Sequence, residues 1–119
     1  MIELYSIPLE QTALSTIMGS DQGADEFVSV LDQSDFFSTK HQIIFGHIKA
    51  QHAKGESFDE VTVYELIKAN TLEHNQIDEK FITNLMSAIK QPYTLETHIK
   101  KLKDFASRRL LWSWTTPRK

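Results

Sequence analysis

Five histidines are the residues of this chain best suited to chemistry, as metal ligands or as acids and bases. Three of them, His41, His47 and His52, fall in one helical stretch, but their spacings of six and five residues miss the i, i+4 pair of a helical zinc site. His41 and His52 do share a helix face, yet about 16 Å of helix separates them, too far to hold one ion. We therefore expect no metal site and assign the histidines to the surface or its boundary.

The carboxylates are scattered along the chain, and many stand at or near expected helix starts, where negative charge favours the helix dipole. Capping and solubility explain residues such as Glu10, Asp35 and Asp59 better than a paired acid and base. The chain contains neither a G-x-x-x-x-G-K-[ST] phosphate cradle nor a G-x-S-x-G nucleophile turn. We expect no catalytic residue, no bound cofactor and no enzyme activity.

Apolar residues recur at helical spacing, and no strand-like alternation is sustained. Helices are predicted from Pro8 to Met18, around 27–31, from a Ser38 or Thr39 cap to Gly55, from a Ser57 or Asp59 cap to Ile67, at 78–89, and from 95 to 112 or beyond. Residues 70–76 are expected to form a polar loop, and Pro92 to break the chain before the last helix. The sequence therefore predicts an all-α fold, a compact bundle of about six helices.

The apolar faces of these helices predict the core. Its expected members include Phe45, Ile48, Leu66, Leu85 and Met86. The adjacent Phe36 and Phe37 must also be buried somewhere. Trp112 and Trp114 differ, because two residues on a helix turn through about 200° and one face cannot bury both. Either the helix has frayed by that point, or one tryptophan awaits a partner.

Composition limits the classes of protein. A chain of 119 residues, 40% hydrophobic and 24% charged, is long enough for one globular domain. No apolar run approaches the roughly 18–20 residues of a membrane span, and the lack of cysteine fits a reducing cytoplasm, where we expect the protein. The net charge of −3 argues against a free-standing DNA binder, although positive charge gathers late, from Lys100 to Lys119.

The order of these features resembles a known family. The stretch S-I-P-L-E-Q-T-A-L-S-T-I-M-G is similar to the entry motif of DnaB-type replicative helicases. The resemblance extends over residues 6–111 with matching spacing, through Leu31, Asp35-Phe36-Phe37, His41, Ile44-Phe45, Ile48, Gly55, Asp59, Thr62, Glu65-Leu66, Ile77, Phe81, Leu85, Pro92 and Arg109-Leu110.

The resemblance implies the non-catalytic N-terminal domain of such a helicase. Residues 1–92 would form its helical head, and residues 93–119 a C-terminal helix, the first arm of a helical hairpin, with a short tail. In that family the domain pairs with itself, forms a collar on the hexameric ring, and receives primase or a helicase loader, while ATP and Mg²⁺ belong to a helicase domain absent from this chain. The expected protein-interaction residues are Phe105, Arg109, Trp112 and Trp114.

Two departures leave alternatives open. Tyr93-Thr94-Leu95-Glu96 replaces the family's small residues before the last helix, and the ending WSWTTPRK does not resemble the second hairpin arm. The chain is then either an excised domain or a natural stand-alone copy, for example a phage- or plasmid-borne regulator that binds a helicase or primase. A third hypothesis is a small helical DNA binder that uses Lys100 to Arg109 against phosphates.

Overall fold

The computed structural model describes residues 4–19, 24–88 and 95–115, with side chains at all of these positions except 24 and 112–115. Within these residues every regular element is helical, which confirms the all-α prediction. The elements are α1 (Ile7–Gly19), α2 (Ala24–Val30), the 3-10 turn η1 (Gln33–Asp35), α3 (Thr39–Ala53), α4 (Glu60–Lys68), α5 (Thr71–Gln76), α6 (Glu79–Met86) and α7 (Leu95–Thr115).

Helix α5 was not expected, since its residues were predicted as a polar loop. The side chain of Asn70 accepts a hydrogen bond from the backbone N–H of Glu73 at 3.2 Å and caps the helix. No residue of α5 is buried, so it has no apolar stripe by which a sequence pattern could reveal it. Helix α6 also ends at Met86, three residues before the predicted boundary, and the predicted break at Pro92 lies outside the described residues.

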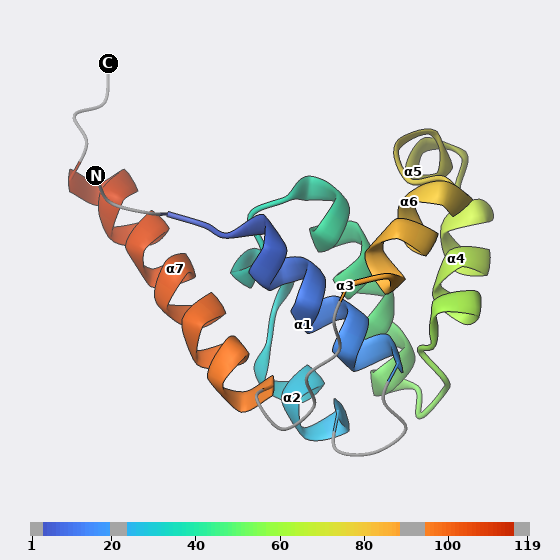
Figure 1. Cartoon of the computed structure of the whole chain (residues 1–119), viewed down its shortest axis with the longest axis horizontal. Helices are drawn as coiled ribbons and strands as arrows, with labels where there is room; N and C mark the ends of the chain where they lie inside the picture. The colour runs from blue at the N-terminus through green and yellow to red at the C-terminus, as the bar shows by residue number, and fades with distance from the viewer. Residues whose placement is uncertain (1–3, 20–23, 89–94, 116–119) are drawn as a thin grey trace.

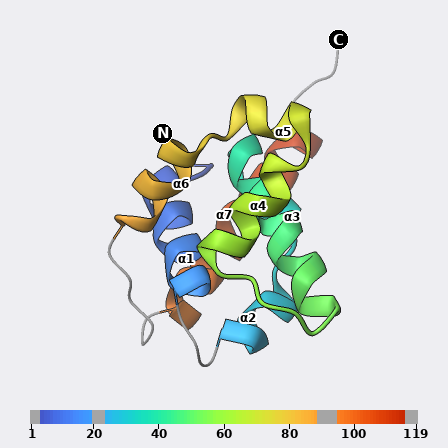
Figure 2. The ribbon, with the colours of Figure 1, turned by 90° about the vertical axis from the view of Figure 1, so that its right-hand side faces the viewer.

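Helices α1 and α3 organise the fold. Helix α1 packs against α2, α3, α6 and α7, and α3 packs in turn against η1, α2 and α4. In Figure 1, α7 lies along one side of the molecule and α4 and α5 lie at the opposite end. Figure 2 shows the same arrangement from the α4 side, with α7 behind. The two ends therefore present separate surfaces to solvent.

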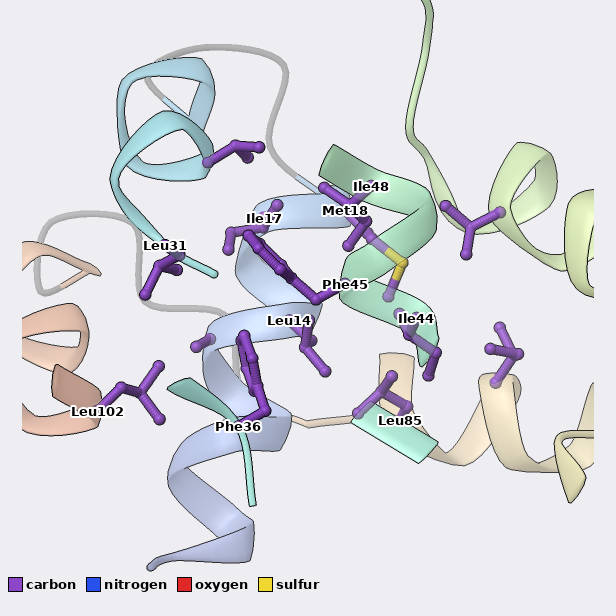
Figure 3. Close-up of a cluster of buried hydrophobic side chains, with 14 of the residues drawn as sticks. Leu14, Ile17, Met18, Leu31, Phe36, Ile44, Phe45, Ile48, Leu85 and Leu102 are labelled. Carbon is purple, nitrogen blue, oxygen red and sulfur yellow. The ribbon is translucent and has the colours of Figure 1, made fainter. Parts of the chain in front are cut away.

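The core lies between these helices (Figure 3). The largest fully buried apolar side chains come from five helices and three connecting segments: Leu14, Ile17, Leu31, Phe36, Ile44, Phe45, Ile48, Ile67, Ile77, Leu85 and Leu102. The predictions for Phe45, Ile48 and Leu85 are confirmed. Leu66 and Met86 are only half-buried, because Val63 and Ile67 form the inner face of α4 and Ile82 and Leu85 that of α6.

Two signals near Gly55 and Asp59 fix the turn between α3 and α4. Gly55 has φ +71°, a left-handed conformation that glycine adopts without strain, and it follows the end of α3. Of the two candidate caps, Asp59 is the one used: its Oδ1 accepts from the N–H of Thr62 at 2.8 Å. That hydrogen bond, with help from the Ser57 hydroxyl, holds the pKa of Asp59 below its usual value.

Candidate protein-interaction surface

A buried polar contact joins α1 to the start of α3. The Glu10 carboxylate accepts hydrogen bonds from the N–H of Phe37 at 2.8 Å, from the N–H of Ser38 at 3.3 Å and from Nδ1 of His41 at 2.9 Å. Glu10 and His41 are 1% and 2% exposed. A buried carboxylate is tolerated when its oxygens meet donors in this way.

Both residues correct the sequence analysis, which placed His41 at the surface or boundary and gave Glu10 a capping or solubility role. The chain buries this pair because the two backbone donors that precede α3 need an acceptor inside the fold. A histidine–carboxylate pair is also the usual form of a catalytic base. Here, however, neither side chain is accessible to a substrate, so the pair holds α1 against α3.

The other histidines lie at the boundary of the fold, as expected. His47, His52, His74 and His98 are all half-buried. His47 Nε2 lies 2.6 Å from Glu73 Oε1 and ties α3 to α5. Partial burial, with the nearby charge of Lys101, lowers the pKa of His98. Within the residues that the structure describes, no group of three or more histidines, aspartates or glutamates could hold a metal ion.

Arg109 connects three separate parts of the chain. Its Nη1 donates to the carbonyl of Leu4 at 2.8 Å, and its Nη2 lies 3.3 Å from the carbonyl of Ser34 and 3.2 Å from that of Asp35. The guanidinium also lies over the ring of Phe37, at 5.8 Å from the centroid. The predicted interaction residue therefore positions the N-terminal segment and η1 against α7.

Exposed apolar side chains lie near Arg109. Tyr5 and Phe37 are each 46% exposed, and Leu110 and Leu111 are 55% and 60% exposed. Tyr5 and Phe37 stack with their ring centroids 3.9 Å apart. We call Tyr5, Phe37, Arg109 and Leu110 the α7 patch. The expectation that Phe37 would be buried is wrong: Phe36 enters the core, and Phe37, one residue on in extended chain, points the other way.

A groove lies beside the patch, between η1 and α7. Its volume is about 480 Å³, and its lining residues are Ser34, Asp35, Lys103, Ala106, Ser107, Arg109 and Leu110. Asp35 is 5% exposed and is neutralised by Lys103, whose Nζ lies 2.8 Å from Asp35 Oδ2. Asp35 is thus a buried ion-pair partner rather than a solubilising surface group. The predicted capping role is confirmed, because its Oδ2 also accepts from the N–H of Asp32 at 2.8 Å at the start of η1.

The remaining predicted interaction residues also lie on α7. Phe105 is half-buried beneath the guanidinium of Arg108, which is 5.3 Å from its ring centroid. Trp112 and Trp114 belong to α7, which continues to Thr115, so the alternative of a helix already frayed there is wrong. Their side chains lie outside the described residues.

Three of the five cations on the described part of α7 pair with carboxylates. Lys100 pairs with Glu96 at 3.5 Å, Lys103 with Asp35 at 2.8 Å, and Arg108 with Asp104 at 2.6 Å. Phosphate binding would have to compete with these pairs, which weakens the DNA-binding hypothesis. Among the described residues, no helix is both long enough and apolar enough to cross a membrane.

Comparison with known proteins identifies the family of this domain. The family model described as "DnaB-like helicase N terminal domain" matches residues 2–104. This chain belongs to that family. Its match is to the helicase N-terminal domain alone, which is not itself the catalytic part of a DnaB-like helicase.

A solved structure agrees with the assignment. The N-terminal domain of DnaB helicase from Mycobacterium tuberculosis superposes with a TM-score of 0.81 at 22% sequence identity. The alignment covers 92% of this chain and 79% of that one. At 22% identity, this structural similarity shows only that the two chains share the same fold. No curated protein matches the chain.

The structure also gives physical reasons for the DnaB-like motif. Glu10 of the entry motif holds the start of α3, His41 is its buried partner, and Asp59 caps α4. Three polar motif residues therefore stabilise the packing and the helix starts of this DnaB-like domain. The division into 1–92 and 93–119 remains a prediction, and so does the interaction role of Phe105, Arg109, Trp112 and Trp114.

Proposed function

We propose that this DnaB-like domain works by protein contact in the cytoplasm: it associates with itself, contributes to a collar on a hexameric helicase ring, and docks primase or a helicase loader during DNA replication. The observation that carries the proposal is the family match over residues 2–104. The exposed α7 patch supports it, because a cluster of exposed apolar side chains often marks a site of interaction.

The composition of the patch suits protein recognition. Tyrosine and arginine are enriched among the residues that dominate binding energy, and Tyr5, Phe37 and Arg109 here form one stacked series. The backbone contacts of Arg109 fix the series before any partner arrives. Such preorganisation lowers the entropic cost of binding.

Calorimetric titration of the chain with the primase and with the helicase loader from the same source tests the docking role. We expect one of them to bind, and Phe37→Ala to weaken that binding at least tenfold, because the variant removes the stacked ring at the centre of the patch. The matched control is Val61→Ala, which removes an exposed apolar side chain (67% exposed) from α4 at the other end of the molecule. ATP with Mg²⁺ should give no binding heat. Failure of both proteins to bind, or stoichiometric binding of ATP, would contradict the proposal.

A further inference from the structure

The groove between η1 and α7 has an unbalanced positive charge. Asp35 and Lys103 neutralise each other, which leaves Arg109 as the remaining charged residue among those that line the groove. The hydrogen bonds of Arg109 within the described residues go to backbone carbonyls, which carry no formal charge. A guanidinium has five N–H donors, and these three contacts use at most three of them. Arg109 therefore retains both charge and donors for an incoming anion.

The same groove has an apolar part. Ala106 and Leu110 lie one helical turn apart on α7 and share a face, while the hydroxyls of Ser34 and Ser107 complete the lining. Its volume of about 480 Å³ is within the range of pockets that accept a specific ligand group. Exposed Leu110 also makes the groove continuous with the α7 patch.

We propose that this groove binds an acidic segment of a partner protein, with a carboxylate on Arg109 and a neighbouring apolar side chain against Ala106 and Leu110. The inference rests on the proposed docking function and names the chemistry that the partner must present. Arginine and carboxylate form short, charge-assisted hydrogen bonds, often two at once, so one acidic side chain satisfies the unused donors.

Charge favours a peptide over a nucleic acid at this site. Nucleic-acid affinity depends on several cations that meet successive phosphates, whereas the groove lining has one positive charge in excess. Neighbouring cations of α7 are paired with Glu96 and Asp104. A peptide with one carboxylate beside an apolar side chain requires one excess positive charge and an apolar contact, and the groove has both.

Fluorescence anisotropy with two dye-labelled peptides tests the inference. The first probe is a twelve-residue helix-forming peptide with leucines at i and i+4 beside a row of glutamates, and the second has glutamine in place of every glutamate. We expect the acidic peptide to bind at least tenfold more tightly than its neutral counterpart. Ser107→Glu should lower the affinity for the acidic peptide at least tenfold, because it places a carboxylate in the groove. Ser107→Arg should raise that affinity.

The matched control is Thr97→Glu, which adds the same charge at an exposed position of the first turns of α7, away from the groove. It should change the affinity less than twofold. Circular dichroism shows whether each variant is folded, and both serine variants change an exposed side chain. No binding of the acidic peptide at millimolar concentration, equal binding of both peptides, or preferential binding of a single-stranded oligonucleotide that Ser107→Glu abolishes would overturn the inference. If primase or loader still binds while the peptide fails, the proposed function stands and this inference alone is lost.

Discussion

Glu10→Ala is expected to lower the free energy of unfolding by about 3–5 kcal/mol, the usual cost of breaking a buried pair by removing one partner. The substitution leaves the buried Nδ1 of His41 and the partly buried N–H groups of Phe37 and Ser38 without their acceptor. Each buried donor that loses its partner costs about 1–3 kcal/mol, although relaxation and water entry make the sum smaller than three full penalties. Urea unfolding at neutral pH, followed by circular dichroism, measures the difference.

Glu65→Ala is the matched control for this prediction. Both glutamates belong to the DnaB-like motif, but Glu65 is exposed on α4, where a surface substitution should change stability by no more than about 0.5 kcal/mol. The loss of stability for Glu10→Gln should lie between those for Glu10→Ala and Glu65→Ala. The glutamine amide has one acceptor oxygen, whereas the carboxylate presents two oxygens to these donors. Equal effects of Glu10→Ala and Glu65→Ala would show that the buried contact does not hold α1 against α3.

Phe45→Ala should have a similar effect, a loss of about 3–5 kcal/mol, because it removes a large side chain and leaves a cavity. Phe45 is 0% exposed, and its ring lies 5.1 Å from that of Phe36, centroid to centroid. Figure 3 shows it between α1 and α3, the two helices that organise the core. The shift of the unfolding midpoint in urea, at an unchanged slope, is the measurement.

Two further variants calibrate the result at Phe45. Phe45→Leu keeps most of the apolar volume and should lose clearly less than the alanine variant. Val30→Ala removes methyl groups from a side chain that is 52% exposed on α2, and it should be close to neutral. A loss under about 0.5 kcal/mol for Phe45→Ala would mean that the inner face of α3 is misplaced.

The helices that the sequence predicted well are those with a complete apolar stripe. On α3, Ile44, Phe45 and Ile48 recur at helical spacing and are all fully buried. On α7, Leu95, Ile99 and Leu102 also recur at helical spacing and are buried, at 2%, 6% and 1% exposed. Periodicity fails for α5, which buries no residue and depends on its Asn70 cap and on its neighbours. The spacing of apolar residues therefore predicts a helix where that helix buries an apolar face of its own in the core.

Sequence reasoning failed most clearly for buried polar groups. Glu10 and His41 are thirty-one residues apart, and only the fold brings them within 2.9 Å. Asp35 and Lys103 are further apart along the chain and meet in the same way. A carboxylate has the same local pattern whether it is solvated or buried, so spacing alone could not distinguish these residues from exposed ones.

The α7 patch was predicted only in part. Arg109 was named as an interaction residue from the resemblance to the helicase family, but Tyr5 and Phe37 were not. Tyr5 and Phe37 join the patch through Arg109. Its guanidinium contacts the carbonyls of Leu4 and Asp35 and lies over the ring of Phe37, so these segments are held beside α7. Contacts between residues so distant in the chain depend on tertiary structure. No single helix face could have predicted the surface.

Sedimentation equilibrium from micromolar to millimolar concentration tests the central claim, that this DnaB-like domain acts by self-association and docking, most directly. We expect concentration-dependent dimers in the parent chain. Phe105→Ala and Trp112→Ala should weaken them at least tenfold by removing aromatic contact area, and Leu111→Asp should do the same because burying an unpaired charge in an interface is costly. Leu72→Asp is the matched control, because Leu72 is 75% exposed on α5 at the other end of the molecule, and it should leave the dimer unchanged. A dimer that Leu72→Asp weakens and the three α7 variants do not would move the contact to the head. A strict monomer over the whole range would contradict the claim.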